Sequence, residues 1–346
     1  MDSELSPRGP STAWSTLSVY FIGFTSHFVC NYVAIMYFDD ALLVMLGQHI
    51  AAVLFLQAFT KASMFSLDVE LALRWFPIAS LYCIGLFCFA VAICSTSMPS
   101  FLMICGYEPI AARLIQHLQG DREGSAHDLY FLICMCMGLA VYAMHDLHFD
   151  AIGYCWGVAY AISRVMYAVA VKSKQDEACY TPSEMCMYNS VIAIWALFGM
   201  MFFDIPQMSF ADPPVEAWGI LAASCVCAGA TFPLSFAAQK TVTPTNWLVA
   251  GNAALIPASL MIRWLTADAA PIGDSAWGGL TIASVSVYFY TLNELGGSGT
   301  MHGVCFFLLV FTYFVVFQVC SSLQNPYSTA SVCSSYMNVG GMLAQI

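Results

Sequence analysis

The sequence predicts an all-α integral membrane protein with ten transmembrane helices arranged as two inverted five-helix repeats. Three observations predict this class: 60% of the 346 residues are hydrophobic, only 9% are charged, and the mean hydropathy is +0.74. A soluble domain carries roughly 25% charged residues, so this chain has too little polar surface to face water. The composition therefore excludes a water-soluble enzyme. The net charge of −11 also argues against nucleic acid as a partner, because binding it needs basic patches.

Apolar runs long enough to cross a bilayer follow one another along the chain. A spanning helix needs about 20 mostly apolar residues, and polar or Pro/Gly breaks divide the sequence into ten such runs. We expect spans at residues 14–36, 41–60, 75–97, 99–119, 128–145, 151–171, 186–203, 216–238, 244–266 and 276–292. These form one ten-helix domain over 14–292, preceded by a cytosolic tail at 1–13. The C-terminal extension at 293–346 has no charged residue after Glu294 and contains a candidate eleventh span at 301–322.

Basic residues alternate between loops and thereby indicate which ends of the spans face the cytosol, where Lys and Arg concentrate. Seven of the ten fall in the N-terminal tail or in every second loop: Arg8, Lys61, Arg74, Arg122, Lys172, Lys174 and Lys240. The alternate loops, near 37–40, 95–99, 146–150, 204–215 and 267–275, hold none. We therefore expect a cytosolic N-terminus. Ten spans also fit two inverted halves of five, with a site near the bilayer midplane where the halves meet.

Three of the ionisable side chains inside the expected spans are candidates for a substrate path, because a charge at that depth is costly and usually faces a cavity or a partner. Arg164 lies mid-span and is the strongest candidate for contact with a substrate anion. Arg113 either lines the same path or extends to the cytosolic end of its span. Glu108 either lines that path or caps the break that Pro109 makes in the helix.

Amide side chains are a second group of polar residues at membrane depth, where an unpaired amide is unfavourable. Asn31, Asn189 and Asn252 each lie inside a span. They either bond one helix to another or bind a ligand. Tyr188 and Ser190 flank Asn189, and an aromatic face beside donors and acceptors suits a flat heterocycle. Gly251 precedes Asn252 and would let a ligand approach the helix backbone.

The sequence contains no residues with the spacing of a catalytic or metal site. It has no G-x-x-x-x-G-K-[ST] loop, no G-x-S-x-G elbow and no H-E-x-x-H. The run from His145 to Asp150 has metal-ligand residue types but lacks the second cluster that a zinc site needs. We expect no enzyme activity, no cofactor and no metal.

Several short motifs occur in order along the chain. They are Cys30-Asn31-Tyr32, Gln48-His49, Arg74-Trp75-Phe76-Pro77, Met98-Pro99-Ser100-Phe101, Asp146-Leu147-His148-Phe149, Gly153-Tyr154-Cys155-Trp156, Met187-Tyr188-Asn189-Ser190, Thr243-Pro244-Thr245 and Gly251-Asn252. This ordered set, over residues 15–292, resembles the nucleotide-sugar transporters and triose-phosphate translocators of the drug/metabolite transporter superfamily. The resemblance implies ten helices, a midplane site and exchange of a nucleotide sugar for a nucleoside monophosphate across a Golgi or endoplasmic reticulum membrane.

The chain departs from the family pattern at its cations. Tyr32 and Leu255 stand where the family has lysines, and Cys105 or Gly106 stands where an Arg or Lys is common. Those cations would contact the phosphates, because charge complementarity is the main way to hold a pyrophosphate in a membrane cavity. Arg113 or Arg164 would have to substitute for them.

The leading hypothesis is therefore an antiporter of the nucleotide-sugar type that works by alternating access. Its partners would be a small-molecule substrate and the lipid bilayer, and a homodimer is compatible with the sequence. The expected substrate-binding residues are Tyr188, Asn189, Ser190, Gly251, Asn252, Asn31, Arg164, Arg113 and Glu108. Two alternatives stay open. One is a carrier of a neutral or cationic metabolite, favoured by the missing lysines and by Glu108. The other is a non-transporting membrane protein that kept the fold.

The distribution of Lys and Arg makes a direct prediction about topology. An epitope attached before Met1 should be reached by antibody in cells whose plasma membrane alone is permeabilised, because the basic loops lie on the same side. The same epitope inserted at residue 209, in a loop without Lys or Arg, should be reached only after all membranes are opened. The reverse staining pattern would contradict the expected orientation.

Overall fold

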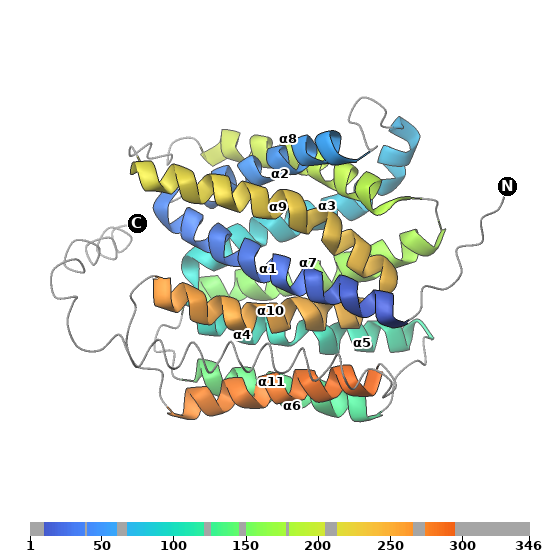
Figure 1. The fold of residues 1–346 in the computed structure, drawn as a ribbon, viewed down its shortest axis with the longest axis vertical. Helices are drawn as coiled ribbons and strands as arrows, with labels where there is room; N and C mark the ends of the chain where they lie inside the picture. Colours follow the sequence, from blue (N-terminus) through green and yellow to red (C-terminus); the bar gives the residue numbers. More distant parts are fainter. Residues whose placement is uncertain are drawn as a thin grey trace. The chain divides into compact units, whose positions relative to one another are not determined.

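The computed structural model describes residues 10–38, 40–60, 68–120, 126–144, 150–177, 180–204, 213–265 and 274–294. Within these ranges the chain forms eleven α-helices (Figure 1). Their bounds are α1 Pro10–Phe38, α2 Ala41–Phe59, α3 Val69–Ser95, α4 Met98–Gly106, α5 Glu108–Leu118, α6 Ala126–Ala143, α7 Ala151–Glu177, α8 Pro182–Asp204, α9 Val215–Thr241, α10 Pro244–Leu265 and α11 Asp274–Glu294.

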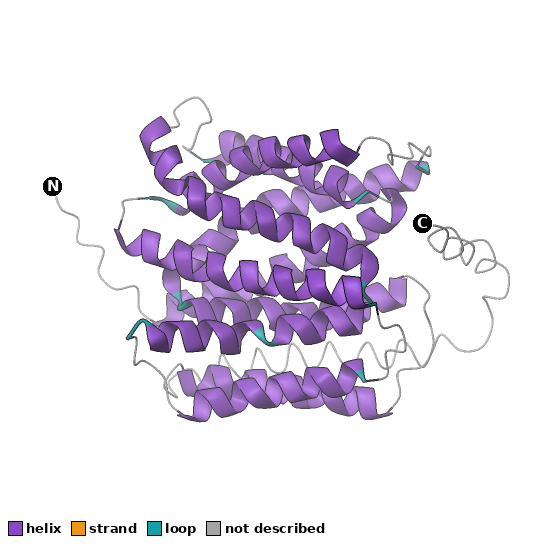
Figure 2. Ribbon diagram, turned by 180° about the vertical axis from the view of Figure 1, so that it is seen from behind, coloured by secondary structure: helices purple, strands orange, loops and turns teal. Residues whose placement is uncertain are grey.

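The all-helical prediction is confirmed for the part of the chain that the structure describes. Figure 2 shows the described residues almost entirely as helices, and no strand occurs in these ranges. Each of the ten expected spans overlaps one of the observed helices or, for 99–119, two of them. The candidate span at 301–322 and residues 1–9 of the expected tail lie outside the described residues. α1 begins at Pro10, so the last residues of the expected tail are helical.

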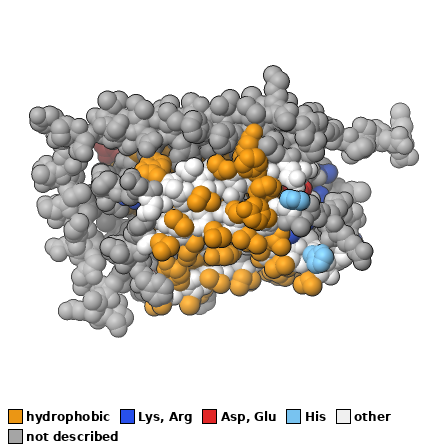
Figure 3. Space-filling model, turned by 90° about the horizontal axis from the view of Figure 1, so that it is seen from below, with side chains coloured by type: hydrophobic (Ala, Val, Ile, Leu, Met, Phe, Trp, Pro, Cys, Tyr) orange, Lys and Arg blue, Asp and Glu red, His pale blue; other side chains and the backbone are white. Residues whose placement is uncertain are grey.

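The surfaces of these helices are those of a multi-pass membrane protein. Within the described ranges, seven helices are long and apolar enough to cross a membrane: α1, α2, α3, α7, α8, α9 and α10. Large apolar side chains face outward midway along them; Trp195 of α8 is 72% exposed and Val226 of α9 is 69% exposed. On the side where α6 and α11 lie, hydrophobic side chains spread across the described surface and charged ones stay at its margins (Figure 3). Such apolar surface is stable against lipid and rare on soluble monomers.

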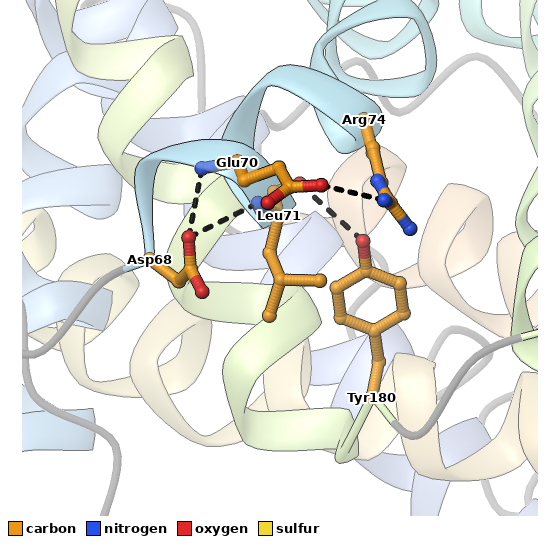
Figure 4. Close-up of polar contacts among 5 residues, drawn as sticks. All are labelled: Asp68, Glu70, Leu71, Arg74 and Tyr180. Carbon is orange, nitrogen blue, oxygen red and sulfur yellow. Dashed lines mark hydrogen bonds and ion pairs between the residues drawn. The ribbon is translucent and has the colours of Figure 1, made fainter.

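The start of α3 shows how a polar cap sets a helix boundary. The Asp68 carboxylate accepts hydrogen bonds from the backbone N–H of Glu70 at 2.8 Å and of Leu71 at 3.5 Å (Figure 4). This cap satisfies donors that have no partner within the helix. α3 therefore begins six residues before the expected span at 75–97. Arg74 lies within the helix rather than in a loop, and it pairs with Glu70 at 2.6 Å on the exposed surface.

The expected fourth span, 99–119, is divided into α4 and α5 at Tyr107. Pro109 causes the break, because proline has no N–H to donate to the carbonyl four residues earlier. That carbonyl, of Cys105, accepts instead from the Asn252 side chain of α10 at 2.6 Å. The next carbonyl, of Gly106, accepts from the Cys136 thiol of α6 at 2.9 Å. The break expected at Pro109 is thus present, and side chains of two neighbouring helices satisfy its backbone.

Helices far apart in the sequence pack against one another. α1 packs against α9 and α10, whereas α7 packs against α3 and α4. α2 packs against α9, and α8 packs against α3. Three further contacts are those of α2 with α8, α5 with α10 and α6 with α11. α6 and α11 run side by side in Figure 1.

The crossing of α6 and α11 depends on two glycines. A Cβ atom on Gly138 would lie 2.6 Å from the Gly279 carbonyl oxygen. A Cβ atom on Gly279 would lie 2.5 Å from the Gly138 carbonyl oxygen. Neither obstacle is a side chain that can turn away, so only glycine permits this approach of the two backbones.

The close approach predicts that Gly279→Leu destabilises the protein whereas Gly278→Leu does not. Leucine at 279 must push α6 and α11 apart, at a cost of about 1–3 kcal/mol for overpacking. Gly278 is a matched control on the same helix, because a Cβ atom there meets nothing within 4 Å among the described residues. Thermal unfolding of both variants in detergent would check this. Equal melting temperatures would contradict the packing role of Gly279.

Candidate functional site: a cavity between the two halves

A cavity of about 160 Å³ lies among seven helices, α1, α2, α3, α7, α8, α9 and α10. Most of its lining residues sit in the middle part of these helices, whereas Cys186 and Trp247 lie near the starts of α8 and α10. On α1 they are Tyr20, Phe24, His27 and Asn31, spaced three or four residues apart and therefore on one helical face. Helices of both halves of the chain thus enclose one space at mid-helix depth.

Neutral hydrogen-bonding side chains form part of the lining. Gln48 of α2 donates to the Asn31 side chain at 2.8 Å and to the Ser224 hydroxyl at 2.6 Å. His49 is hydrogen-bonded to the Tyr82 hydroxyl at 3.3 Å. The rings of His27 and His49 lie 5.3 and 5.0 Å from the Phe232 ring. The Nδ1 atoms of both histidines have no hydrogen-bond partner among the described residues, so both could bond to a ligand.

Arg164 of α7 brings a positive charge to the cavity. Its Nη1 lies 3.0 Å from the Glu108 carboxylate and donates to the Asn252 side chain at 3.3 Å. Only 7% of the Arg164 side chain is exposed, and the Glu108 side chain is fully buried. No other Lys, Arg, Asp or Glu is present in the described cavity wall. Two charges removed from water are stable only when they are paired in this way.

Three aromatic rings surround the Arg164 guanidinium. Its central carbon lies 5.6 Å from the centre of the Phe24 ring, 6.0 Å from that of Tyr160 and 5.3 Å from that of Trp247. These are cation–π distances. The rings come from α1, α7 and α10, so the guanidinium links the two halves of the chain through contacts other than its ion pair.

The Gly251-Asn252 dipeptide positions this guanidinium. A Cβ atom on Gly251 would lie 2.5 Å from Arg164 Nη2, so the absent side chain is what lets the guanidinium lie against α10. Asn252 accepts from Arg164 and donates to the Cys105 carbonyl. In this structure the dipeptide therefore positions Arg164 and satisfies the backbone at the break between α4 and α5.

The nine residues expected from the sequence fall into three groups. Four line the cavity: Asn31, Arg164, Asn189 and Ser190. Three contact Arg164 from outside the cavity lining: Glu108, Gly251 and Asn252. Two, Tyr188 and Arg113, are not among the lining residues.

The asparagine expected to hold a base is bonded within the protein. Asn189 accepts from the Trp75 indole N–H at 2.7 Å and donates to the Tyr167 hydroxyl at 2.7 Å. A ligand would have to share or replace these bonds.

Tyr188 and Arg113 face other parts of the structure. The Tyr188 hydroxyl bonds the backbone of Asp68, accepting from its N–H at 3.2 Å and donating to its carbonyl at 3.4 Å. Tyr188 therefore braces α8 against the start of α3, next to Tyr180, whose hydroxyl donates to the Leu71 carbonyl at 3.3 Å (Figure 4). Arg113 of α5 is half-buried and interacts electrostatically with Tyr290 of α11.

Sequence reasoning did not choose most of the lining as site residues, among them Tyr20, His27, His49, Tyr160 and Trp247. A signal for two of them was present. Tyr20, Phe24, His27 and Asn31 repeat at helical spacing within an apolar run, which is a stripe of aromatic and polar side chains on one face. Tyr160 and Trp247 belong to the site because they contact Arg164, and no local sequence pattern predicts this contact.

Comparison with known proteins supports the fold alone. No family model and no curated protein matches this chain. A solved structure, described only as the crystal structure of a protein, is similar to it with a TM-score of 0.52 and 17% sequence identity. The similarity covers 82% of this chain and 94% of that one. Identity this low leaves the substrate to be argued from the cavity itself.

The buried ion pair predicts a non-additive effect on stability. Arg164→Gln leaves the Glu108 carboxylate without a cation, which should lower the free energy of unfolding by about 3–5 kcal/mol. Glu108→Gln should have a similar effect, and the double variant should lose less than the sum because no buried charge is left unpaired. Arg74→Gln, in the exposed pair with Glu70, is the control and should change little. Additive losses in a thermal double-mutant cycle would show that the two side chains do not interact.

Proposed function

We propose that this protein is a membrane carrier that moves a small metabolite by alternating access. The cavity is the observation that carries the proposal. Most of its lining lies in the middle part of the helices, both halves of the chain enclose it, and several buried polar atoms of its lining residues lack partners among the described residues. Carriers place their substrate sites at this depth and between such halves. A purely structural membrane protein has no use for unpartnered polar atoms there.

The proposed architecture is ten spans in two inverted repeats, with α4 and α5 together making the fourth span. The helix contacts support it, because helices five spans apart have equivalent neighbours. Successive spans alternate in direction, so an odd number of spans per repeat inverts the second repeat relative to the first. The break between α4 and α5 at Tyr107, directly before Glu108, resembles the discontinuous helices from which carriers build their sites.

The first candidate substrate is a nucleotide sugar exchanged for a nucleoside monophosphate in a Golgi or endoplasmic reticulum membrane. Three features support it: the ordered motifs of the sequence, the aromatic lining and the Arg164 cation. The cavity of about 160 Å³ is smaller than the roughly 300–1,000 Å³ of typical small-molecule sites. A nucleotide sugar therefore requires the two halves to move apart before it can enter.

The second candidate is a carrier of a neutral metabolite. The Arg164–Glu108 pair favours it, because the charge of the cation is already balanced within the protein. The neutral lining groups Asn31, Gln48 and His49 could bond to hydroxyls or amides of such a substrate. The two candidates differ in one respect that can be measured, namely whether uptake requires a negative charge on the substrate.

Uptake into proteoliposomes tests the proposal and separates the candidates. Radiolabelled UDP-, GDP- and CMP-sugars would be offered to vesicles preloaded with the matching monophosphate, with free nucleosides and hexoses as neutral probes. The first candidate predicts trans-stimulated uptake of one nucleotide class and its loss in Arg164→Gln, because the phosphate loses its cation. Arg74→Gln is the matched control and should transport normally. Uptake of neutral probes alone would support the second candidate, and no uptake by folded protein would contradict carrier function.

A further inference from the structure

We propose that Glu108 is a proton-carrying group, so that this chain moves an anionic substrate together with a proton. The inference rests on the proposed carrier function and adds an ion coupling to it. In outline, the anion of the substrate replaces Glu108 as the partner of Arg164, and Glu108 crosses the membrane protonated.

The surroundings of Arg164 present donors to an incoming anion. Nη1 is engaged by Glu108 and Asn252, but Nη2 has no hydrogen-bond partner among the described residues. The Trp247 indole N–H also lacks a partner there, and its ring lies 5.3 Å from the guanidinium. Both groups only donate. A carboxylate or phosphate oxygen fits two such donors, whereas a cation or a hydrogen-bond donor does not.

Glu108 cannot stay ionised once another anion holds Arg164. Its side chain is fully buried, and its carboxylate contacts the Arg164 cation and the uncharged side chains of Asn252 and Cys105. The ion pair with Arg164 is therefore the interaction that keeps its charge at this depth. Two anions beside one cation would leave a buried negative charge unbalanced, and a buried group in that position binds a proton instead.

Water supplies the proton at the start of each transport cycle and accepts it at the end. On the side where the substrate enters, an O–H bond forms between a carboxylate oxygen of Glu108 and a proton taken from water. On the other side the substrate leaves, Arg164 pairs with Glu108 again, and the proton returns to water. One proton and one substrate anion cross per cycle, and no bond of the substrate changes.

Several titratable groups face Glu108 from the helices around it. They are Arg164 and Tyr160 from α7, Tyr20 from α1 and Cys105 from α4, while α10 presents the uncharged Asn252. From α6 the Cys136 thiol reaches the same helix break and donates to the Gly106 carbonyl. Arg164 is the cation in this set, so its change of partner is what sets the charge of Glu108.

The position of Glu108 in the chain suits this exchange. It is the first residue of α5, directly after the break at Tyr107. A carboxylate at the start of a helix is favoured by the helix dipole, and a break lets α5 move without deforming α4. The carboxylate can therefore leave Arg164 with a change at one hinge.

Proteoliposomes with an imposed pH gradient test the coupling. The probes are the same radiolabelled nucleotide sugars and, separately, their monophosphates, offered to vesicles without internal substrate, and the membrane potential is clamped at zero. In the wild type, an outside pH one unit below the inside should drive up to about tenfold accumulation, because one pH unit is a tenfold difference in proton activity. Glu108→Gln should remove this accumulation while still exchanging preloaded substrate. Glu70→Gln, in the exposed ion pair, is the matched control and should accumulate like the wild type.

A measurement on the wild type alone guards against misfolding of Glu108→Gln. The external medium should become alkaline as the anion enters, by one proton per substrate. Anion uptake without this signal, or accumulation in Glu108→Gln that still follows the pH gradient, overturns the proton coupling and leaves the carrier function standing. Uptake of neutral probes alone also overturns it. No uptake of any probe overturns both proposals.

Discussion

The ion pair between Arg164 and Glu108 is the interaction on which the middle of this protein depends. Each charge alone would be strongly unfavourable at membrane depth, so α7 and α5 must meet where the two side chains lie 3.0 Å apart. α10 supplies Asn252 to the same guanidinium, and α1 supplies the Phe24 ring. One unavoidable electrostatic requirement therefore brings together helices from both halves of the chain, and the cavity lies at that meeting point.

The backbone of the fourth span also contains a polar group that requires a partner. Pro109 frees the Cys105 carbonyl, and a carbonyl without a partner is costly in a membrane. Asn252 satisfies that carbonyl and also accepts from Arg164. A proline in one helix thus fixes an asparagine in another, and that asparagine orients the charged group of the cavity. The Asn252 side chain thus serves both the interrupted backbone and the buried guanidinium. This explains why polar residues concentrate at this level of an apolar chain.

Much of the fold could be predicted from the sequence, because hydropathy acts locally: the expected spans overlap the observed helices, and Pro109 marks the break. Arg164, Glu108 and Asn252 could also be singled out, since any polar group in an apolar helix requires a partner. Their choice of partners could not be predicted. Asn189 bonds Trp75, which is 114 residues away, and Tyr188 bonds Asp68 rather than facing the cavity. Such pairings depend on how distant helices pack, and helical periodicity says nothing about that.

The central claim is that the cavity opens in turn to the two faces of the membrane, and Cys186 can report it directly. Cys186 lines the cavity and is 1% exposed. Cys136 is buried outside the lining and serves as the internal reference. Membrane-impermeant maleimide would be applied to right-side-out and to inside-out vesicles, and mass spectrometry would quantify each cysteine. The account predicts that Cys186 reacts from both faces while Cys136 stays unmodified. Reaction of Cys186 from one face only, or from neither, would contradict alternating access.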